Sequence, residues 1–212
     1  MQKTITKRNP ELTKERILEA ATEEFAQKGY GSARVDAIAL AAGVNKRMLY
    51  HYYGNKDALF LAILERAYQN IRDHERALDL QHLEPVVAMR ELIRFTFWYF
   101  VEHPEFIRLL NNENLYGAAH IKGSKRVLSM HSPLLWQLQE VLRKGEGQGI
   151  FRSGVSPLQL YISVAGLGYF YLSNSATLGT VFGRDLGKRK ALHERLEHIT
   201  DMVLSYLRPV ES

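Results

Sequence analysis

Apolar residues recur three and four positions apart along most of the chain, a spacing typical of amphipathic helices. Alternating patterns of useful length, which would indicate strands, are not found. In the first third the pattern predicts helices over residues 13–28, 33–42 and 46–53, and a fourth that begins after Asn55. Thr13, Asn45 and Asn55 are the expected N-caps, and Gly43 is the expected C′ residue of the second helix.

The helical pattern continues beyond Asp79, where two prolines are placed to open helices, Pro85 and Pro104. Further helices are predicted at about 133–145, 156–180 and 189–207, with a loop-rich stretch over 117–132. We therefore expect an all-α protein of about nine helices, divided into an N-terminal domain over 10–65 and a helical ligand-binding and dimerisation domain over 66–212.

The stretch between Arg152 and Arg184 contains no charged residue, so a membrane span has to be considered. Six polar residues interrupt its apolar core, and no basic cluster flanks it. A helix buried in a protein bundle is the favoured interpretation, and we expect no membrane association. The polar start of the chain does not resemble a signal peptide.

Charge is spread unevenly along the 212 residues. Residues 1–56 hold ten Lys/Arg and six Asp/Glu, whereas the remainder holds 18 and 17. A basic terminal domain on a near-neutral body favours a polyanionic partner, although a merely solvated basic surface has the same composition. The chain has no cysteine, which is compatible with a cytoplasmic location and leaves no thiolate metal site.

Two short helices joined by a tight glycine turn have the layout of a helix-turn-helix. On a helical wheel with Leu49 facing the core, Arg47 and His51 lie on the opposite face, flanked by Met48 and Tyr50. An arginine there can bond guanine in the major groove, so this helix is a candidate recognition helix for double-stranded DNA. An ordinary helical hairpin with a solvated basic face is the alternative.

Residues 10–65 resemble the DNA-binding domain of the TetR family of bacterial repressors. The matching positions are Thr13 to Ala21, Phe25, Gly29, Tyr30, Val35, Ile38, Ala39, Ala42, Gly43, Val44, Leu49, Tyr50, Tyr52, Tyr53 and Asn55 to Leu59. The resemblance implies a three-helix DNA-binding head, a helical body that binds a small-molecule effector, and a homodimer on a near-palindromic operator. It implies DNA contacts from Asn45, Lys46, Arg47, Met48, Tyr50 and His51, and a phosphate contact from Lys56.

One position departs from the family pattern. Where the family has hydroxyl residues opening the second helix, this chain has Ala33 and Arg34. Ser32 is then the expected cap, and Arg34 is expected to reach a phosphate as a cation, which would increase the salt dependence of binding.

The body carries no signature motif, although its second half loosely resembles the pyrimidine-sensing subgroup of the family. The resemblance places an effector pocket among the middle helices, where polar residues interleave with aromatic ones. Most of the aromatic residues are expected to be core. The candidate effector residues are Trp98, Arg108, Asn112, Tyr169 and Asn174.

The last two helices are the expected dimer interface, where Gly166 and Gly168 would permit close backbone approach. An enzyme is the main rival, but no metal, triad or phosphate-loop pattern is found, and no cofactor is expected. An interaction scaffold that merely retains the head is the second rival. The function that the sequence favours is therefore a ligand-responsive repressor released from DNA by its effector.

Overall fold

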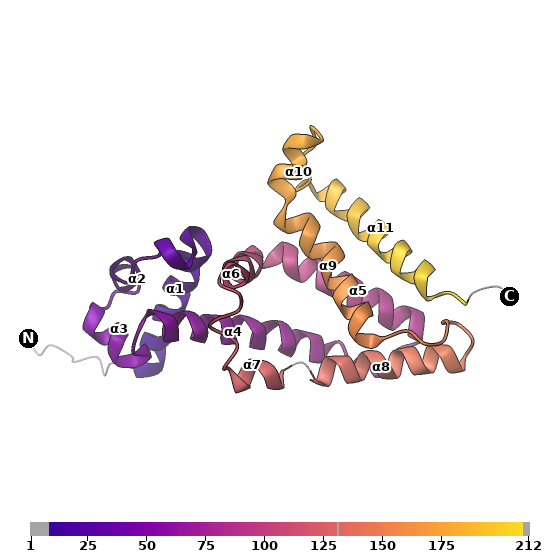
Figure 1. The fold of residues 1–212 in the computed structure, drawn as a ribbon, viewed down its shortest axis with the longest axis horizontal. Coiled ribbons are helices and arrows are strands. Elements are labelled where there is room, and N and C mark those ends of the chain that lie inside the picture. Colours follow the sequence, from indigo (N-terminus) through magenta and orange to yellow (C-terminus); the bar gives the residue numbers. More distant parts are fainter. Residues whose placement is uncertain (1–8, 131, 210–212) are drawn as a thin grey trace, which may run out of the picture. The chain divides into compact units, whose positions relative to one another are not determined.

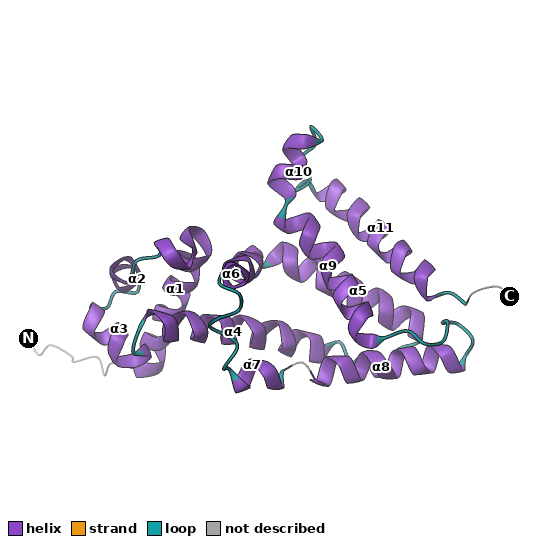
Figure 2. Ribbon diagram, viewed as in Figure 1, coloured by secondary structure: helices purple, strands orange, loops and turns teal. Residues whose placement is uncertain are grey.

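The computed structural model describes residues 9–130 and 132–209, which are helical with connecting loops and contain no strand (Figures 1 and 2). The helices are α1 (Pro10–Ser32), α2 (Val35–Ala41), α3 (Lys46–Tyr53), α4 (Lys56–Ala77), the 3-10 helix η1 (Leu80–His82), α5 (Pro85–Glu102), α6 (Pro104–Leu115), α7 (Lys125–Ser129), α8 (Ser132–Gly147), α9 (Pro157–Ser173), α10 (Ser175–Val181) and α11 (Arg189–Leu207). The all-α prediction is confirmed. The helices in this part of the chain exceed the expected nine because α7 and α10 are short and separate.

The chain forms two compact units. The first comprises the chain up to Ala67 together with Arg108–Lys125, and the second comprises Tyr68–Ile107 and the chain from Arg126 onward. The first division falls within α4, close to the expected boundary after residue 65. The second falls within α6, which the sequence did not indicate, so the last two turns of α6 and the loop after it belong to the first unit.

The first unit is built around aromatic and aliphatic side chains from α1 to α4. Ile38 and Leu49, from α2 and α3, are fully buried beside Phe25 and Phe60, whose ring centroids lie 4.9 Å apart. Leu109 of α6 joins the same core. Burial of one such side chain contributes roughly 1.5–3 kcal/mol, so this core fixes the orientation of α3.

The second unit has α5 at its centre, packed against α8, α9 and α11. Its core includes Leu92 and Phe97 of α5, Leu138 of α8, Val164 of α9 and Val203 of α11. The uncharged α9 is buried at Leu160, Val164 and Gly168, whereas Ile162 and Phe170 on the same helix are exposed. Within residues 9–130 and 132–209, no helix combines the length and apolar character needed to cross a membrane.

The first helix starts earlier in the structure than the sequence predicts. The first helix begins at Pro10, and its N-cap is Asn9, whose side chain accepts a hydrogen bond from the Glu11 N–H. Thr13 is instead buried in the first turn, and its hydroxyl donates to the Asn9 carbonyl. Gly29, with φ of 75°, interrupts the helical conformation at the predicted stop.

The uncharged helix predicted over 156–180 is two helices. Asn174 separates α9 from α10, and its side-chain amide donates to the Phe170 carbonyl. The hydroxyls of Ser175 and Thr177 also donate to nearby backbone carbonyls. Short polar side chains that bond the local backbone in this way favour a break over a continuous helix.

Candidate DNA-binding surface and effector-binding groove

The turn between α2 and α3 has the geometry that a helix-turn-helix requires. Gly43 takes φ of 63°, and the Val44 N–H donates to the Ala39 carbonyl at 2.9 Å, which closes α2. The Asn45 side chain accepts from the Met48 N–H at 2.8 Å and caps α3. The predicted caps at Asn45 and Gly43 are thus confirmed.

The outer face of α3 is exposed and cationic. Leu49 is fully buried, whereas Arg47, Tyr50 and His51 are exposed, as the helical wheel indicates. Met48 is half-buried beside them. This arrangement leaves a guanidinium, a phenol and an imidazole directed away from the core of the unit.

Two of the predicted DNA contacts already have partners on the protein. The Asn45 side-chain oxygen is used by the cap, so its amide N–H₂ is the part left for DNA. The Lys46 ammonium lies 3.0 Å from the Asp36 carboxylate, and this hydrogen bond raises the pKa of Lys46. Lys46 is therefore positioned by α2 and stays charged.

The start of α2 is not capped by Ser32, which corrects the expectation from the sequence. No side-chain cap is made at this position, and the Arg34 N–H donates at 3.0 Å to the Glu24 carboxylate of α1. That bond lowers the pKa of Glu24. The Arg34 side chain itself is exposed and available for a phosphate.

Lys56 is held at the start of α4 by aromatic rings. Its ammonium lies 4.8 Å from the ring centroid of Tyr30 and 5.9 Å from that of Phe25. Burial raises the pKa of Tyr30 to about 12, and its hydroxyl donates to Asp57. Asn55 caps α4 by accepting from the Ala58 N–H at 2.7 Å, as predicted.

Two of the five candidate effector residues belong to the first unit. Asn112 accepts a hydrogen bond from the Tyr30 N–H at 3.0 Å, and its own amide donates to the Arg108 carbonyl. The Arg108 side chain is exposed. The carboxylate of the next residue, Glu113, is buried and accepts from the backbone N–H groups of His120 and Ile121. The second half of α6 and the loop after it therefore pack within the first unit, and their polar groups bond to that unit.

The other three candidates lie in the second unit but do not converge. Tyr169 packs edge-on against Phe100 with centroids 6.2 Å apart, and Asn174 ends α9 as described above. Trp98 differs from these two because it lines a groove, with its ring 5.1 Å from that of His193.

That groove, with a volume of about 750 Å³, runs along α5 between the end of α4 and the start of α11. Three aromatic side chains and several cationic or imidazole groups line it. They are Phe95, Trp98, Tyr99, His74, His103, His193, Arg94 and Arg189, with Leu78, Glu102, Gly187 and Leu192. We call it the α5–α11 groove.

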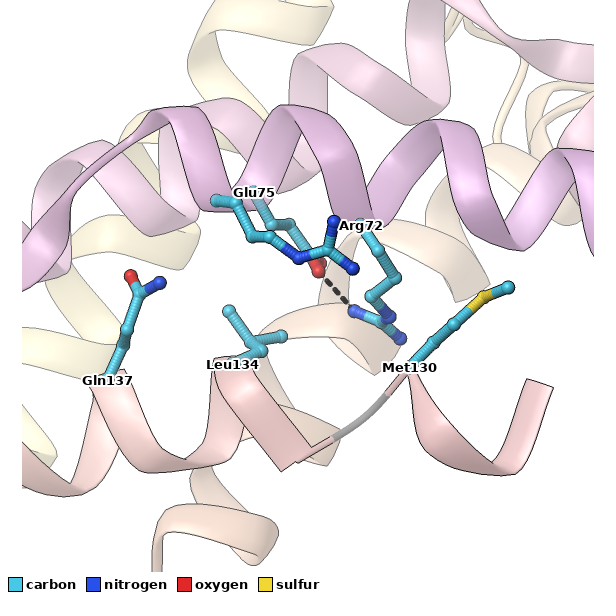
Figure 3. A pocket seen from close by; sticks show the side chains of 6 residues that line it. Arg72, Glu75, Met130, Leu134 and Gln137 are labelled. Carbon is cyan, nitrogen blue, oxygen red and sulfur yellow. Dashed lines mark hydrogen bonds and ion pairs between the residues drawn. The ribbon is translucent and has the colours of Figure 1, made fainter. Parts of the chain in front are cut away.

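A buried ion pair in the same unit was not anticipated from the sequence (Figure 3). Arg72 and Glu75 of α4 are 3% and 2% exposed and are paired, and Arg72 also donates to the Tyr161 hydroxyl at 2.9 Å. Burial raises the pKa of Glu75. The space that these residues enclose with Gln137 does not admit a water molecule, so we regard the pair as framework and not as a ligand site.

The head with its exposed recognition helix, joined to a larger helical unit, is the organisation of a helix-turn-helix transcriptional regulator. The family model for the DNA-binding region, "Bacterial regulatory proteins, tetR family", matches residues 17–63. The model "Tetracyclin repressor-like, C-terminal domain" matches residues 85–203. The chain belongs to the TetR family.

Relatives of known name agree with this assignment. The chain is 34% identical over 196 residues to the HTH-type transcriptional repressor NicS of Pseudomonas putida, covering 92% of each chain. It is 25% identical to the HTH-type transcriptional regulator RutR of Escherichia coli K12, covering 92% and 91%. The fold matches the fatty acid degradation regulator FadR of Bacillus halodurans with a TM-score of 0.64, over 92% and 100% of the chains at 17% identity. The chain is a transcriptional regulator and not an enzyme.

Proposed function

We propose that this protein is a ligand-responsive repressor that binds a near-palindromic operator as a homodimer and leaves it when a small-molecule effector binds the second unit. The observation that supports DNA reading is the exposed face of α3, where Arg47 lies opposite the fully buried Leu49. An arginine so placed can bond guanine bidentately. The name of NicS, a repressor, supports repression over activation. We also propose a cytoplasmic location, because a repressor of this kind acts on operator DNA.

The exposed surface of α9 and α11 supports the homodimer. Ile162 and Phe170 of α9 are 52% and 59% exposed, and Met202 and Tyr206 of α11 are 46% and 47% exposed. Apolar side chains so exposed on two neighbouring helices suit an interface between two copies of the chain. A two-fold axis would then set the heads on half-sites about 34–36 Å apart, or a multiple of one helical turn.

Of the five effector residues proposed from the sequence, we retain one. Trp98 lines the α5–α11 groove and stays in the proposal. Arg108, Asn112, Tyr169 and Asn174 make the contacts described above and do not line it, so we do not assign them to the effector.

The proposal is tested by titrating the protein into promoter fragments at two salt concentrations. We expect the wild type to select one fragment, and Arg47→Ala to weaken that binding by about 1–3 kcal/mol while relaxing the preference at one position per half-site. Lys122→Ala is the matched control because it removes an exposed charge of the same sign in the same unit, from the segment between α6 and α7 and not from the helix-turn-helix.

The two variants together decide the outcome. If Arg47→Ala binds its operator with unchanged affinity and sequence preference, α3 does not read DNA. If Lys122→Ala loses as much affinity as Arg47→Ala, the contribution of Arg47 is general charge and not base recognition. A wild-type chain that selects no fragment would favour the scaffold interpretation.

A further inference from the structure

We propose that the α5–α11 groove binds a planar aromatic anion of one or two rings. This inference rests on the proposed function, because such a molecule would be the effector of the repressor. The groove has a volume of about 750 Å³, which lies within the range of roughly 300–1,000 Å³ that is typical of small-molecule sites.

Aromatic rings form one side of the groove. Phe95, Trp98 and Tyr99 come from consecutive turns of α5, and Trp98 is half-buried with its indole facing His193. The His74 ring lies nearly parallel to Phe95, at an interplanar angle of 17° and a centroid distance of 6.4 Å. Offset and edge-to-face packing on such rings favours a flat ligand over a puckered one.

Arg189 supplies one positive charge at the other side of the groove, where α11 begins. Arg189 is the first residue of α11, and none of the ion pairs among the described residues involves its guanidinium. The first turn of α11 has no acidic residue and no side-chain cap. The N-terminus of a 19-residue helix therefore adds its dipole to the charge of Arg189, and both favour an anion.

The other charged groups of the groove, Arg94 and Glu102, lie on α5. Arg94 pairs with Glu91 on its own helix, and Glu102 is the acidic residue that lines the groove. The charge of Arg94 is therefore balanced by Glu91, and that of Glu102 stands against Arg189, so the preference for an anion rests on Arg189, unpaired among the described residues, and on the N-terminus of α11. A carboxylate on the ligand would meet Arg189 in the bidentate geometry that guanidinium groups provide.

Two imidazoles are oriented for additional ligand contacts. Nδ1 of His74 lies 2.8 Å from the Asn70 carbonyl, and Nδ1 of His193 lies 2.7 Å from the Arg189 carbonyl. A carbonyl can only accept, so Nδ1 carries the proton in both rings and Nε2 remains for a ring substituent. Hydroxyl or ring N–H groups on the ligand would be recognised here.

The test is isothermal titration calorimetry on the full chain without DNA, using benzoate and 2-naphthoate as probes. We expect both to bind. Cyclohexanecarboxylate keeps the charge and loses planarity, whereas benzamide keeps planarity and loses the charge. Each should bind at least tenfold more weakly than benzoate. Uracil, a neutral planar ring suggested by the loose sequence resemblance, should also bind at least tenfold more weakly.

Variants then locate the binding. Arg189→Ala should weaken benzoate binding at least tenfold, and Trp98→Leu should weaken it at least fivefold. Lys190→Ala is the matched control, since it removes the neighbouring charge of the same helix from a side chain that does not line the groove. It should change benzoate affinity by less than twofold. Circular dichroism verifies that each variant is folded.

Several results would overturn the inference. One is that neither benzoate nor 2-naphthoate binds. Another is that cyclohexanecarboxylate or a neutral ring binds as tightly as benzoate. The third is that Arg189→Ala and Lys190→Ala change benzoate affinity equally. The operator titration distinguishes these from failure of the proposed function. A chain that selects an operator but binds no aromatic acid overturns the ligand assignment alone. A chain that binds benzoate in the groove but no DNA overturns the repressor.

Discussion

The side-chain oxygen of Asn112 accepts a hydrogen bond from the backbone N–H of Tyr30 at 3.0 Å, across 82 positions of the sequence. The same oxygen would lie 2.7 Å from a Cβ built on Gly29. Gly29 takes φ of 75°, a conformation that also favours glycine. The end of α1 and the second half of α6 are therefore fitted to each other within the first unit.

We expect Asn112→Ala to lower the free energy of unfolding by about 1–3 kcal/mol, because the partly buried Tyr30 N–H loses its acceptor. Chemical denaturation measures the change. Asn114→Ala, at an exposed position of the same helix, should change stability by less than about 0.5 kcal/mol. Equal effects of the two variants would mean that the Tyr30 bond contributes nothing specific.

Lys56→Ala should weaken binding to every DNA sequence alike, because a phosphate contact carries no sequence information. The slope of log affinity against log salt should become shallower by about 0.9 for each chain that loses one phosphate contact. Fluorescence anisotropy over a salt series gives the slope. A change in sequence preference without a change in slope would assign Lys56 to bases.

We expect the first unit to lose stability in acid as Glu24 becomes protonated. Its pKa is lowered in the folded protein, chiefly by the hydrogen bond from the Arg34 N–H. The stabilisation is complete above the ordinary value of 4.5 and is lost as the pH falls through the lowered folded value. Glu24→Gln should remove this part of the pH dependence, as followed by unfolding titrations between pH 3 and 6 (about the range where carboxylates titrate). An unchanged acid profile in the variant would contradict it.

Glu75→Ala should destabilise the second unit by about 3–5 kcal/mol, because it leaves the Arg72 charge buried without its carboxylate. The double variant Arg72→Met/Glu75→Leu should cost less than the single one, since no charge is then left buried. Glu140→Ala is the control, because its partner Arg143 is 72% exposed and such pairs contribute about 0–1 kcal/mol. Thermal unfolding compares the three.

The two glycines of α9 should respond differently to enlargement. A Cβ on Gly166 would meet nothing within 4 Å in its own chain, whereas one on Gly168 would contact Phe97 and Phe100 at 3.5 and 3.6 Å. We expect Gly166→Leu to leave the monomer folded and to weaken the dimer in sedimentation velocity. Gly168→Leu should instead destabilise the core of the second unit. A wild-type chain that sediments as a monomer at micromolar concentration would remove the dimer from the proposed function.

Features encoded over a few residues could be predicted from the sequence. The caps at Asn45 and Asn55 and the turn at Gly43 depend on neighbours within four positions, and they are confirmed. The burial of Leu49 followed from the helical spacing of apolar residues and is confirmed too. The DNA-facing side of α3 could be inferred for the same reason.

Contacts between distant positions were missed. Ser32 was the expected cap of α2, but a carboxylate ten positions before Arg34 receives that N–H. The bond from Arg72 to Tyr161 joins residues 89 positions apart, and no local pattern marks either as a partner. Residue type alone does not distinguish a groove residue such as Trp98 from a residue that ends a helix, such as Asn174.

The division of the chain within α4 and α6 has a consequence for building hybrid regulators. Exchanging heads between relatives at residue 65 would transfer Tyr30 and Gly29 but leave Asn112 and Leu109 with the recipient. The transplanted head would then meet an acceptor and a core side chain selected for another sequence. A functional chimaera of this protein should carry residues 108–125 together with the first 67, as a two-segment graft.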